Sequence, residues 1–144
     1  MSQASIGWGS SFELHNGTAL TAIAEATSIG FPEYTADEIE VTHLLSPGRI
    51  REFISGLTDA GELAVEMNYI PGSTTDLMLQ AAQKQGNTRA WKIVVSDAAG
   101  EPAWEADGTG FVKSYSRDAL EVDSVKKATV VIRVSGDVTE AAAA

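Results

Sequence analysis

Apolar and polar residues alternate along much of this chain, and a period of two is the pattern of β-strands that bury one face. The alternation is most regular at 63–69, where every second residue is large and apolar. This predicts a strand with two sets of side chains: Leu63, Val65, Met67 and Tyr69 facing inward, and Glu62, Ala64, Glu66 and Asn68 facing outward.

A second alternating run lies at Asp37–His43. Ile39 and Val41 fall on its apolar side, and the opposite side is polar. The run therefore predicts another half-buried strand. Because Glu38 and Glu40 lie on its polar side, as glutamates do in the strand at 63–69, the two strands are expected to share an acidic outer face.

Turn and capping signals delimit the other elements. Asn16-Gly17 between apolar runs predicts a tight hairpin, and Ser28–Pro32 is expected to be a break. Ser73 followed by Asp76 predicts the start of a helix that ends near Gln85. Further strands are predicted at Arg89–Val95, Ala103–Ala106, Thr109–Arg117 and Lys126–Val134, with Trp91 and Trp104 as core anchors. About seven strands and one helix indicate a mainly β fold of the sandwich or barrel type.

The length of 144 residues suits a single domain with one core. We expect this domain at 1–137, with an N-terminal arm at 1–10 and a flexible tail at 138–144. Twenty acidic residues against ten basic ones give a net charge of −10, which disfavours tight binding of nucleic acid or an anionic membrane. The absence of a long apolar run or a signal-peptide pattern predicts a soluble protein made in the cytoplasm.

Catalytic chemistry has little support in the sequence. There is no cysteine, and the two histidines, His15 and His43, have no partner identifiable from spacing. Glu38 with Glu40, or Glu62 with Glu66, are better interpreted as solvated acids than as a glycosidase pair. No glycine-rich phosphate loop is present. We therefore expect no enzyme activity, no cofactor and no metal.

The connection between the two alternating runs, Leu44–Gly61, is the most informative segment. Its 18 residues exceed the length beyond which loops in compact domains are usually functional or disordered, about 12–15 residues. It is too apolar for a solvated loop. Either it folds back over its own domain, or it covers a surface of another molecule through these apolar residues: Leu44, Leu45, Ile50, Phe53, Ile54 and Leu57.

Charge favours contact with another molecule. Arg49 and Arg51 are the only basic residues among the first 83, which contain eleven acidic residues and have a net charge of −9. The remaining 61 residues have a net charge of −1. Two arginines in an apolar loop on an acidic half-molecule favour head-to-tail contact between identical copies, which produces rings or filaments.

The run VTHLLSPGRIREFISGLTDAGELAVEMNYIPGS, at Val41–Ser73, resembles the major tail tube proteins of long, non-contractile-tailed bacteriophages of the siphovirus type. A looser similarity extends from Ser28 to Gly136. The resemblance implies a β-sandwich with one flanking helix, assembled as hexameric rings stacked into a hollow tube. It implies a structural protein of the virion, present in the cytoplasm of a bacterial host before assembly.

By this resemblance the partners are other copies of the chain and the tape measure, tail terminator and distal tail proteins. DNA passes through the tube without specific binding, and no membrane is involved. The expected intersubunit contacts are Leu44, Leu45, Arg49, Ile50, Arg51, Phe53, Ile54 and Leu57. The expected lumen lining is Glu38, Glu40, Glu62, Glu66 and Asn68, an acidic wall that repels phosphate.

Two other functions fit the sequence. One is a tail terminator, tail-completion or other virion protein, which would form a single closed ring. The other is a monomeric carbohydrate-binding sandwich that uses Trp8, Trp91 or Trp104 to stack against a ligand.

Overall fold

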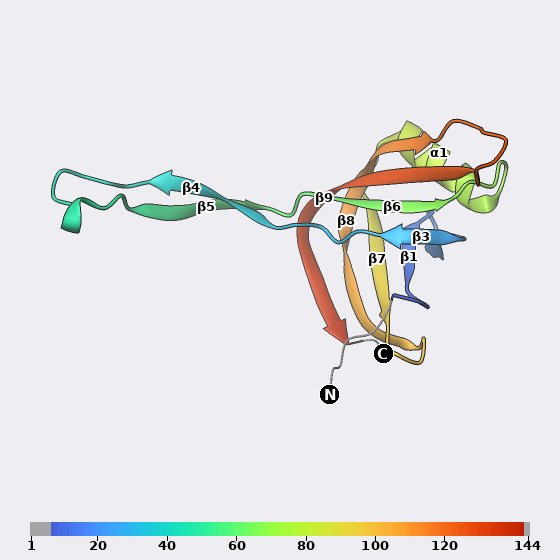
Figure 1. Cartoon of the computed structure of the whole chain (residues 1–144), viewed down its shortest axis with the longest axis horizontal. Helices are drawn as coiled ribbons and strands as arrows, with labels where there is room; N and C mark the ends of the chain where they lie inside the picture. The colour runs from blue at the N-terminus through green and yellow to red at the C-terminus, as the bar shows by residue number, and fades with distance from the viewer. Residues whose placement is uncertain (1–6, 143–144) are drawn as a thin grey trace.

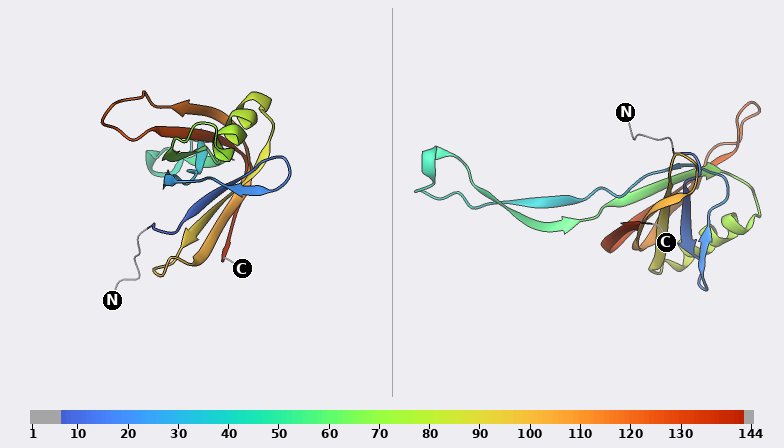
Figure 2. Two further views of the ribbon diagram at one scale, coloured as in Figure 1. Left: turned by 90° about the vertical axis from the view of Figure 1, so that its right-hand side faces the viewer. Right: turned by 90° about the horizontal axis from the view of Figure 1, so that it is seen from below.

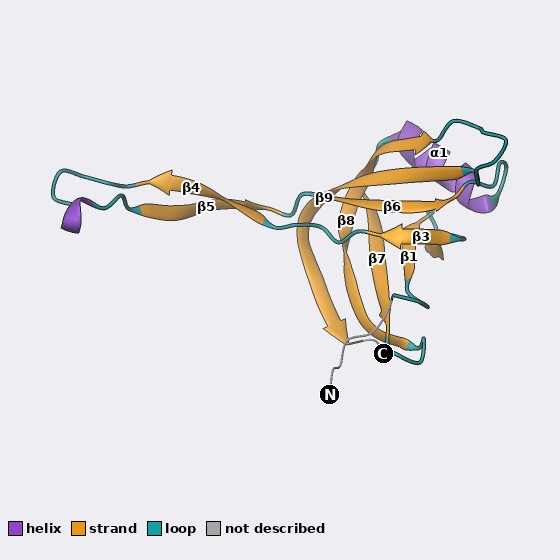
Figure 3. Cartoon of the chain, in the orientation of Figure 1, coloured by secondary structure: helices purple, strands orange, loops and turns teal. Residues whose placement is uncertain are grey.

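The computed structural model describes residues 7–142. Nearly all of its regular structure is β, as the sequence predicts (Figures 1 and 3). The elements in chain order are β1 (Ser11–His15), β2 (Leu20–Ala22), β3 (Ala26–Ile29), β4 (Thr35–Glu40), the 3-10 helix η1 (Pro47–Arg49), β5 (Phe53–Asp59), β6 (Glu62–Asn68), α1 (Thr74–Gln85), β7 (Arg89–Ser96), β8 (Pro102–Arg117) and β9 (Lys127–Ala142).

Seven strands form one antiparallel sheet in the order β2-β1-β7-β8-β9-β6-β3. The sheet curls, because β8 and β9 are 16 residues long and bend along their length (Figure 2). Segment 23–25 joins the two ends of the curl: the Ile23 N–H donates to the Phe12 carbonyl of β1, and the Asn68 N–H of β6 donates to the Glu25 carbonyl. The expected sandwich is thus one continuous sheet folded over itself.

The core fills the inside of this curl. The alternation predicted for β6 is confirmed, since Leu63, Val65 and Met67 are at most 2% exposed. Trp91 lies beside Phe12 with ring centroids 6.5 Å apart. The helix α1 adds one face to the same core, through Met78, Leu79 and Ala82.

The helix begins and ends as the sequence predicts. Ser73 caps its N-terminus by accepting a hydrogen bond of 3.2 Å from the Asp76 N–H, and Gly86 ends it in the left-handed conformation. Asp76 itself is buried and accepts hydrogen bonds from Tyr115 of β8 and from Gln80. This carboxylate therefore ties the helix to the sheet.

Several sequence-based boundaries are wrong. The expected break at Ser28–Pro32 begins inside β3, and the two strands expected between Ala103 and Arg117 are the single strand β8. The tail expected to be flexible from residue 138 is part of β9 as far as Ala142, because 139–142 pair with 104–107 of β8. Residues 143–144, and residues 1–6 of the expected N-terminal arm, lie outside the described residues.

The three tryptophans have different environments. Trp91 is buried, which confirms it as a core anchor and leaves no face for a ligand. Trp104 is 43% exposed, so its expected place in the core is wrong; its indole N–H donates to Glu140 of β9 at 3.3 Å. Trp8 is exposed, and its ring lies over Gly100.

Candidate functional site: the projecting hairpin and the outer face of β6

The hairpin of β4 and β5 is a two-stranded sheet of its own that projects from the curled sheet along the longest axis of the molecule (Figures 1 and 2). We call residues 33–61 the arm. β4 is exposed along its whole length, so the half-buried strand expected at Asp37–His43 is wrong. Leu44–Gly61 is not a loop either, because it contains η1 and β5.

All the apolar residues predicted for intersubunit contact lie on this arm, and they are between 51% and 102% exposed: Leu44, Leu45, Ile50, Phe53, Ile54 and Leu57. None of them belongs to the core cluster. The alternative that this segment folds back over its own domain is therefore wrong. Exposed apolar patches on this scale are typical of interaction surfaces.

The tip of the arm is held by local hydrogen bonds. The Ser46 hydroxyl donates to Glu52 at 3.0 Å and accepts from the His43 N–H at 2.9 Å. The Glu52 N–H donates to the Thr42 hydroxyl at 2.8 Å. These bonds hold the turn in shape and leave its leucines and isoleucine free. His43 thus has a structural part in the turn, since its ring nitrogen accepts from the Leu45 N–H.

Charge is divided along the arm. The two arginines predicted for contact, Arg49 and Arg51, lie at the tip, are exposed and form no ion pair within residues 7–142. The acidic residues Asp37, Glu38 and Glu40 lie on β4, nearer the sheet. The arm therefore has a basic apolar tip and an acidic middle section.

The root of the arm is fixed to the sheet at a point that sequence reasoning missed. Arg133 of β9 donates to Asp59 at 2.6 Å, and the Gly61 N–H donates to the other carboxylate oxygen of Asp59 at 2.9 Å. The Gly61 N–H and then Arg133 hold the pKa of Asp59 below its usual value. Gly61 has φ 73°, and a Cβ there would lie 2.9 Å from the Glu33 carbonyl oxygen, so a side chain is disfavoured.

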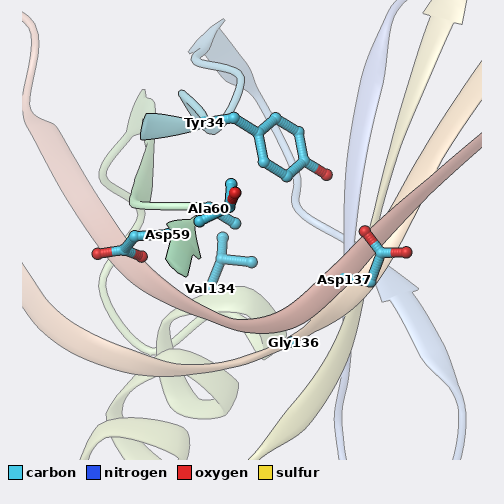
Figure 4. A pocket seen from close by; sticks show the side chains of 7 residues that line it. Tyr34, Asp59, Ala60, Val134, Gly136 and Asp137 are labelled. Carbon is cyan, nitrogen blue, oxygen red and sulfur yellow. The ribbon is translucent and has the colours of Figure 1, made fainter. Parts of the chain in front are cut away.

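A hollow of about 320 Å³ lies beside this attachment point. Figure 4 shows Tyr34 over Ala60 and Val134, and the Tyr34 hydroxyl donates to the Val138 carbonyl at 3.4 Å. Asp137 lies on its other side. The hollow separates the arm from the bend of β9 and holds no cluster of chemical groups typical of an active site.

The outer face of β6 carries the other predicted site residues, Glu62, Glu66 and Asn68. Its neighbours on β9 are basic at two of the paired positions, since Glu62 lies opposite Arg133 and Asn68 opposite Lys127. Glu62 also pairs with Lys113 of β8 at 2.5 Å. This part of the sheet thus carries mixed charge and is not uniformly acidic.

Glu38 and Glu40 do not share this face. β4 pairs only with β5, whereas β6 pairs with β3 and β9. The expectation of one acidic face made by the two alternating strands is therefore wrong. Its cause is that the chain leaves the curled sheet after β3 and returns to it only at β6.

Among residues 7–142 no group of three His, Asp or Glu side chains is placed to hold a metal ion, and no helix is long and apolar enough to cross a membrane. A curled sheet with an exposed apolar arm has the build of a structural subunit that assembles with other subunits. Residues 11–143 match the family model of lambda-like phage tail tube proteins. The chain belongs to this family, and it is a structural subunit of a tail tube, a part of the virion.

Solved structures share the fold. A chain in the tail of a gene transfer agent particle, refined with C6 symmetry, aligns with a TM-score of 0.74 and 15% identity over 94% of this chain and 98% of that one. A chain in the anti-feeding prophage baseplate gives 0.77 and 12% identity over 98% and 97%. The SPP1 tail tube gives 0.68 and 12% identity over 97% and 80%. The sequence matches no curated protein.

Proposed function

We propose that six copies of this chain form a ring, that rings stack into a hollow tube, and that the arm is the contact between copies. The observation that carries this proposal is the exposure of every large apolar residue on the arm. A projecting hairpin gains little stability from such exposed side chains in a monomer, whereas burying them against another copy removes apolar area from water. The sixfold symmetry of the gene transfer agent tail supports the number of copies.

Edge strands support the same assembly. β2 and β3 form the two edges of the curled sheet, and each leaves backbone groups unpaired on its outer side. Ring closure would pair such edges between neighbouring copies. The paired edges would then no longer be open to aggregation with other chains.

The outer face of β6, with Glu62, Glu66 and Asn68, is our candidate for the channel lining. The mixed charge of this face supports passage of DNA, because Lys113 and Arg133 each engage a carboxylate and so offer little free positive charge to phosphate. We assign Glu38 and Glu40 to the arm, since they lie on β4. This candidate lining therefore contains three of the five residues expected from the sequence.

In this role the tube would bind a tape measure protein inside, a terminator at one end and distal tail proteins at the other. The subunit would be present in the host cytoplasm before assembly. It would need neither a catalytic group nor a cofactor, because conduction of DNA through a tube requires only a continuous channel.

Electron microscopy of the purified protein over a range of concentrations tests the proposal. We expect open-ended tubes with sixfold symmetry, alone or after addition of a tail-initiating complex. A protein that stays monomeric under both conditions would contradict the proposal. Single closed rings that do not grow would instead indicate a tail terminator.

A further inference from the structure

A second exposed apolar segment lies at the end of the molecule opposite the tip of the arm. It is the connection between β8 and β9, residues 118–126, which we call the distal loop (Figures 1 and 2). Its three large apolar side chains are at least two-thirds exposed: Leu120, Val122 and Val125. Like the tip, it presents apolar residues that the body of the molecule does not cover.

The tip and the distal loop carry opposite charges in the same arrangement. At the tip, Arg49 and Arg51 flank the exposed Ile50. At the apex of the distal loop, Glu121 and Asp123 flank the fully exposed Val122. A further acid, Asp118, stands at the start of the loop.

We propose that the tip of one copy docks on the distal loop of a second copy, with Ile50 against Val122 and the two arginines against the acids of the loop. This inference rests on the proposed function, in which the arm joins copies, and it names the surface that receives the arm. The contact is head-to-tail, because it joins different surfaces at opposite ends of the molecule. Because the tip and the distal loop lie at opposite ends of the longest axis of the molecule, we assign this contact to successive rings of the stack.

The distal loop has a shape that suits a receiving surface. A hollow of about 560 Å³ opens between the two sides of the loop. It is lined by Asp118, Ala119, Glu121, Ser124, Val125 and Lys127. Its base is closed by a hydrogen bond of 2.9 Å from the Asp118 N–H to the Lys127 carbonyl. The Ser124 hydroxyl donates to Glu121 at 3.0 Å, which orients that carboxylate.

The loop is also anchored firmly where it leaves the sheet. The Arg117 guanidinium, at the end of β8, lies 5.7 Å from the ring centroids of both Tyr69 and Tyr115. Cation–π contacts of this kind restrain the strand end from which the loop departs. A restrained loop loses less conformational freedom when a partner binds.

Charge argues against the other apolar hollow of the body as the receiving surface. That hollow lies beside α1 and includes the exposed Leu77, but its one charged lining residue is Arg89. That hollow has no acid to attract the arginines of the tip, whereas two acids, Asp118 and Glu121, outnumber Lys127 in the lining at the distal loop. The acidic middle section of a neighbouring arm, with the exposed Ile39, is the remaining alternative.

Cysteine cross-linking tests the contact directly, because the natural sequence contains no cysteine. In the variant I50C/V122C, the two cysteines of one molecule lie at opposite ends, so a disulfide forms between copies and not within one. Assembled tubes exposed to copper phenanthroline should give a ladder of covalent multimers on a denaturing gel. The variants I50C/L77C and I50C/I39C are the controls, and each should give at least tenfold less multimer.

Charge reversal provides the second test. We expect R49E/R51E and E121R/D123R each to lower the yield of tubes at least tenfold, and the four substitutions together to restore most of it. The control E101R/D107R makes the same change of charge at two exposed acids away from the loop and should assemble normally.

The outcomes separate the two proposals. Normal tubes from E121R/D123R, or a ladder from I50C/I39C in place of I50C/V122C, would overturn the docking on the distal loop and leave the tube intact. Failure of the fourfold variant to assemble while both double variants keep a native circular dichroism spectrum would also overturn it. Wild-type protein that never assembles would overturn both proposals.

Discussion

The curled sheet and the arm are both antiparallel β-structure, yet the sheet buries its large apolar side chains on one face and the arm exposes them to solvent. In the sheet, Leu63 and Val65 are at most 1% exposed, whereas Leu44 at the tip of the arm is fully exposed. The sheet is therefore stabilised by burial within one molecule. The arm is held in shape by strand pairing and by the hydrogen bonds around Ser46 and Glu52, and its apolar side chains remain available to another molecule.

This difference separates what keeps the molecule folded from what lets it assemble. A subunit of this kind has to be stable before it meets its neighbours, so its core cannot depend on the interface. The arm is attached through Asp59, Gly61 and Arg133, and Ala60 is its one residue in the core cluster. The following predictions test that separation.

The largest effect is expected from the same substitution made in the two regions. Leu63→Ala leaves a cavity in the core and should lower the free energy of unfolding by about 3 kcal/mol. Leu44→Ala removes a side chain that contacts water and should change it by less than about 0.5 kcal/mol. Urea unfolding at a dilution that keeps the protein monomeric measures both. Similar losses in the two variants would show that the arm packs on its own molecule.

A smaller effect is expected at the buried carboxylate that joins α1 to the sheet. Burial disfavours ionisation of Asp76, but hydrogen bonds from Gln80, the Gly72 N–H and Tyr115 outweigh it and hold its pKa below the usual value. Asp76→Asn should therefore lower the free energy of unfolding by about 2 kcal/mol at neutral pH, since it removes charge-assisted hydrogen bonds.

The same carboxylate makes stability depend on pH. Because its pKa is lower in the folded chain than in the unfolded one, ionised Asp76 stabilises the fold above the unfolded value of about 4, and this contribution is lost as the pH falls through the lower, folded value. Unfolding measured from pH 6 to pH 2 should show a shallower decline for Asp76→Asn than for the wild type. Asp107→Asn, at an exposed position, is the control. If the stability of Asp107→Asn declined as little with falling pH as that of Asp76→Asn, Asp76 would have no special role.

A secondary-structure element of this fold could be predicted from the sequence when its apolar residues pack against the core of the same chain. β6 and α1 were predictable because their apolar residues meet the core of the same chain, which imposes a regular period. β5 was missed because both of its faces are exposed: Phe53 and Ile54 are adjacent and apolar, and no alternation marks the strand. The end of β9 was missed because its alanines carry no strand signal, and only pairing with β8 makes them a strand.

The candidate site was predicted in part. The apolar and basic residues of the arm could be singled out from composition alone, since two arginines and six large apolar residues in one segment are conspicuous. Their position on a projecting hairpin could not be predicted, because the length of the hairpin depends on the pairing of β4 with β5. The attachment of Asp59 to Arg133 joins residues 74 positions apart, and no local pattern indicates it.

Assembly should respond to substitutions in the arm that leave stability unchanged. L44N/L45N replaces two exposed leucines at the tip and should lower the yield of tubes at least tenfold, because the apolar area buried between copies is reduced. Leu77→Asn, on the exposed face of α1, is the matched control and should assemble normally. Sedimentation of the polymer measures both. Normal assembly of L44N/L45N would contradict the proposed role of the arm.

The smallest effect is expected where the two regions meet. Two donors act on the Asp59 carboxylate, and the hydrogen bond from the Gly61 N–H is the largest single cause of its lowered pKa, ahead of the hydrogen bond from Arg133. Arg133→Gln should therefore raise the pKa of Asp59 only part of the way towards its usual value, as followed by carbon-13 NMR of the carboxyl group. A return to the full usual value would mean that the Gly61 turn is lost with the ion pair. The arm would then depend on Arg133 for its direction, and the sheet and the arm would be coupled more tightly than the backbone hydrogen bond alone requires.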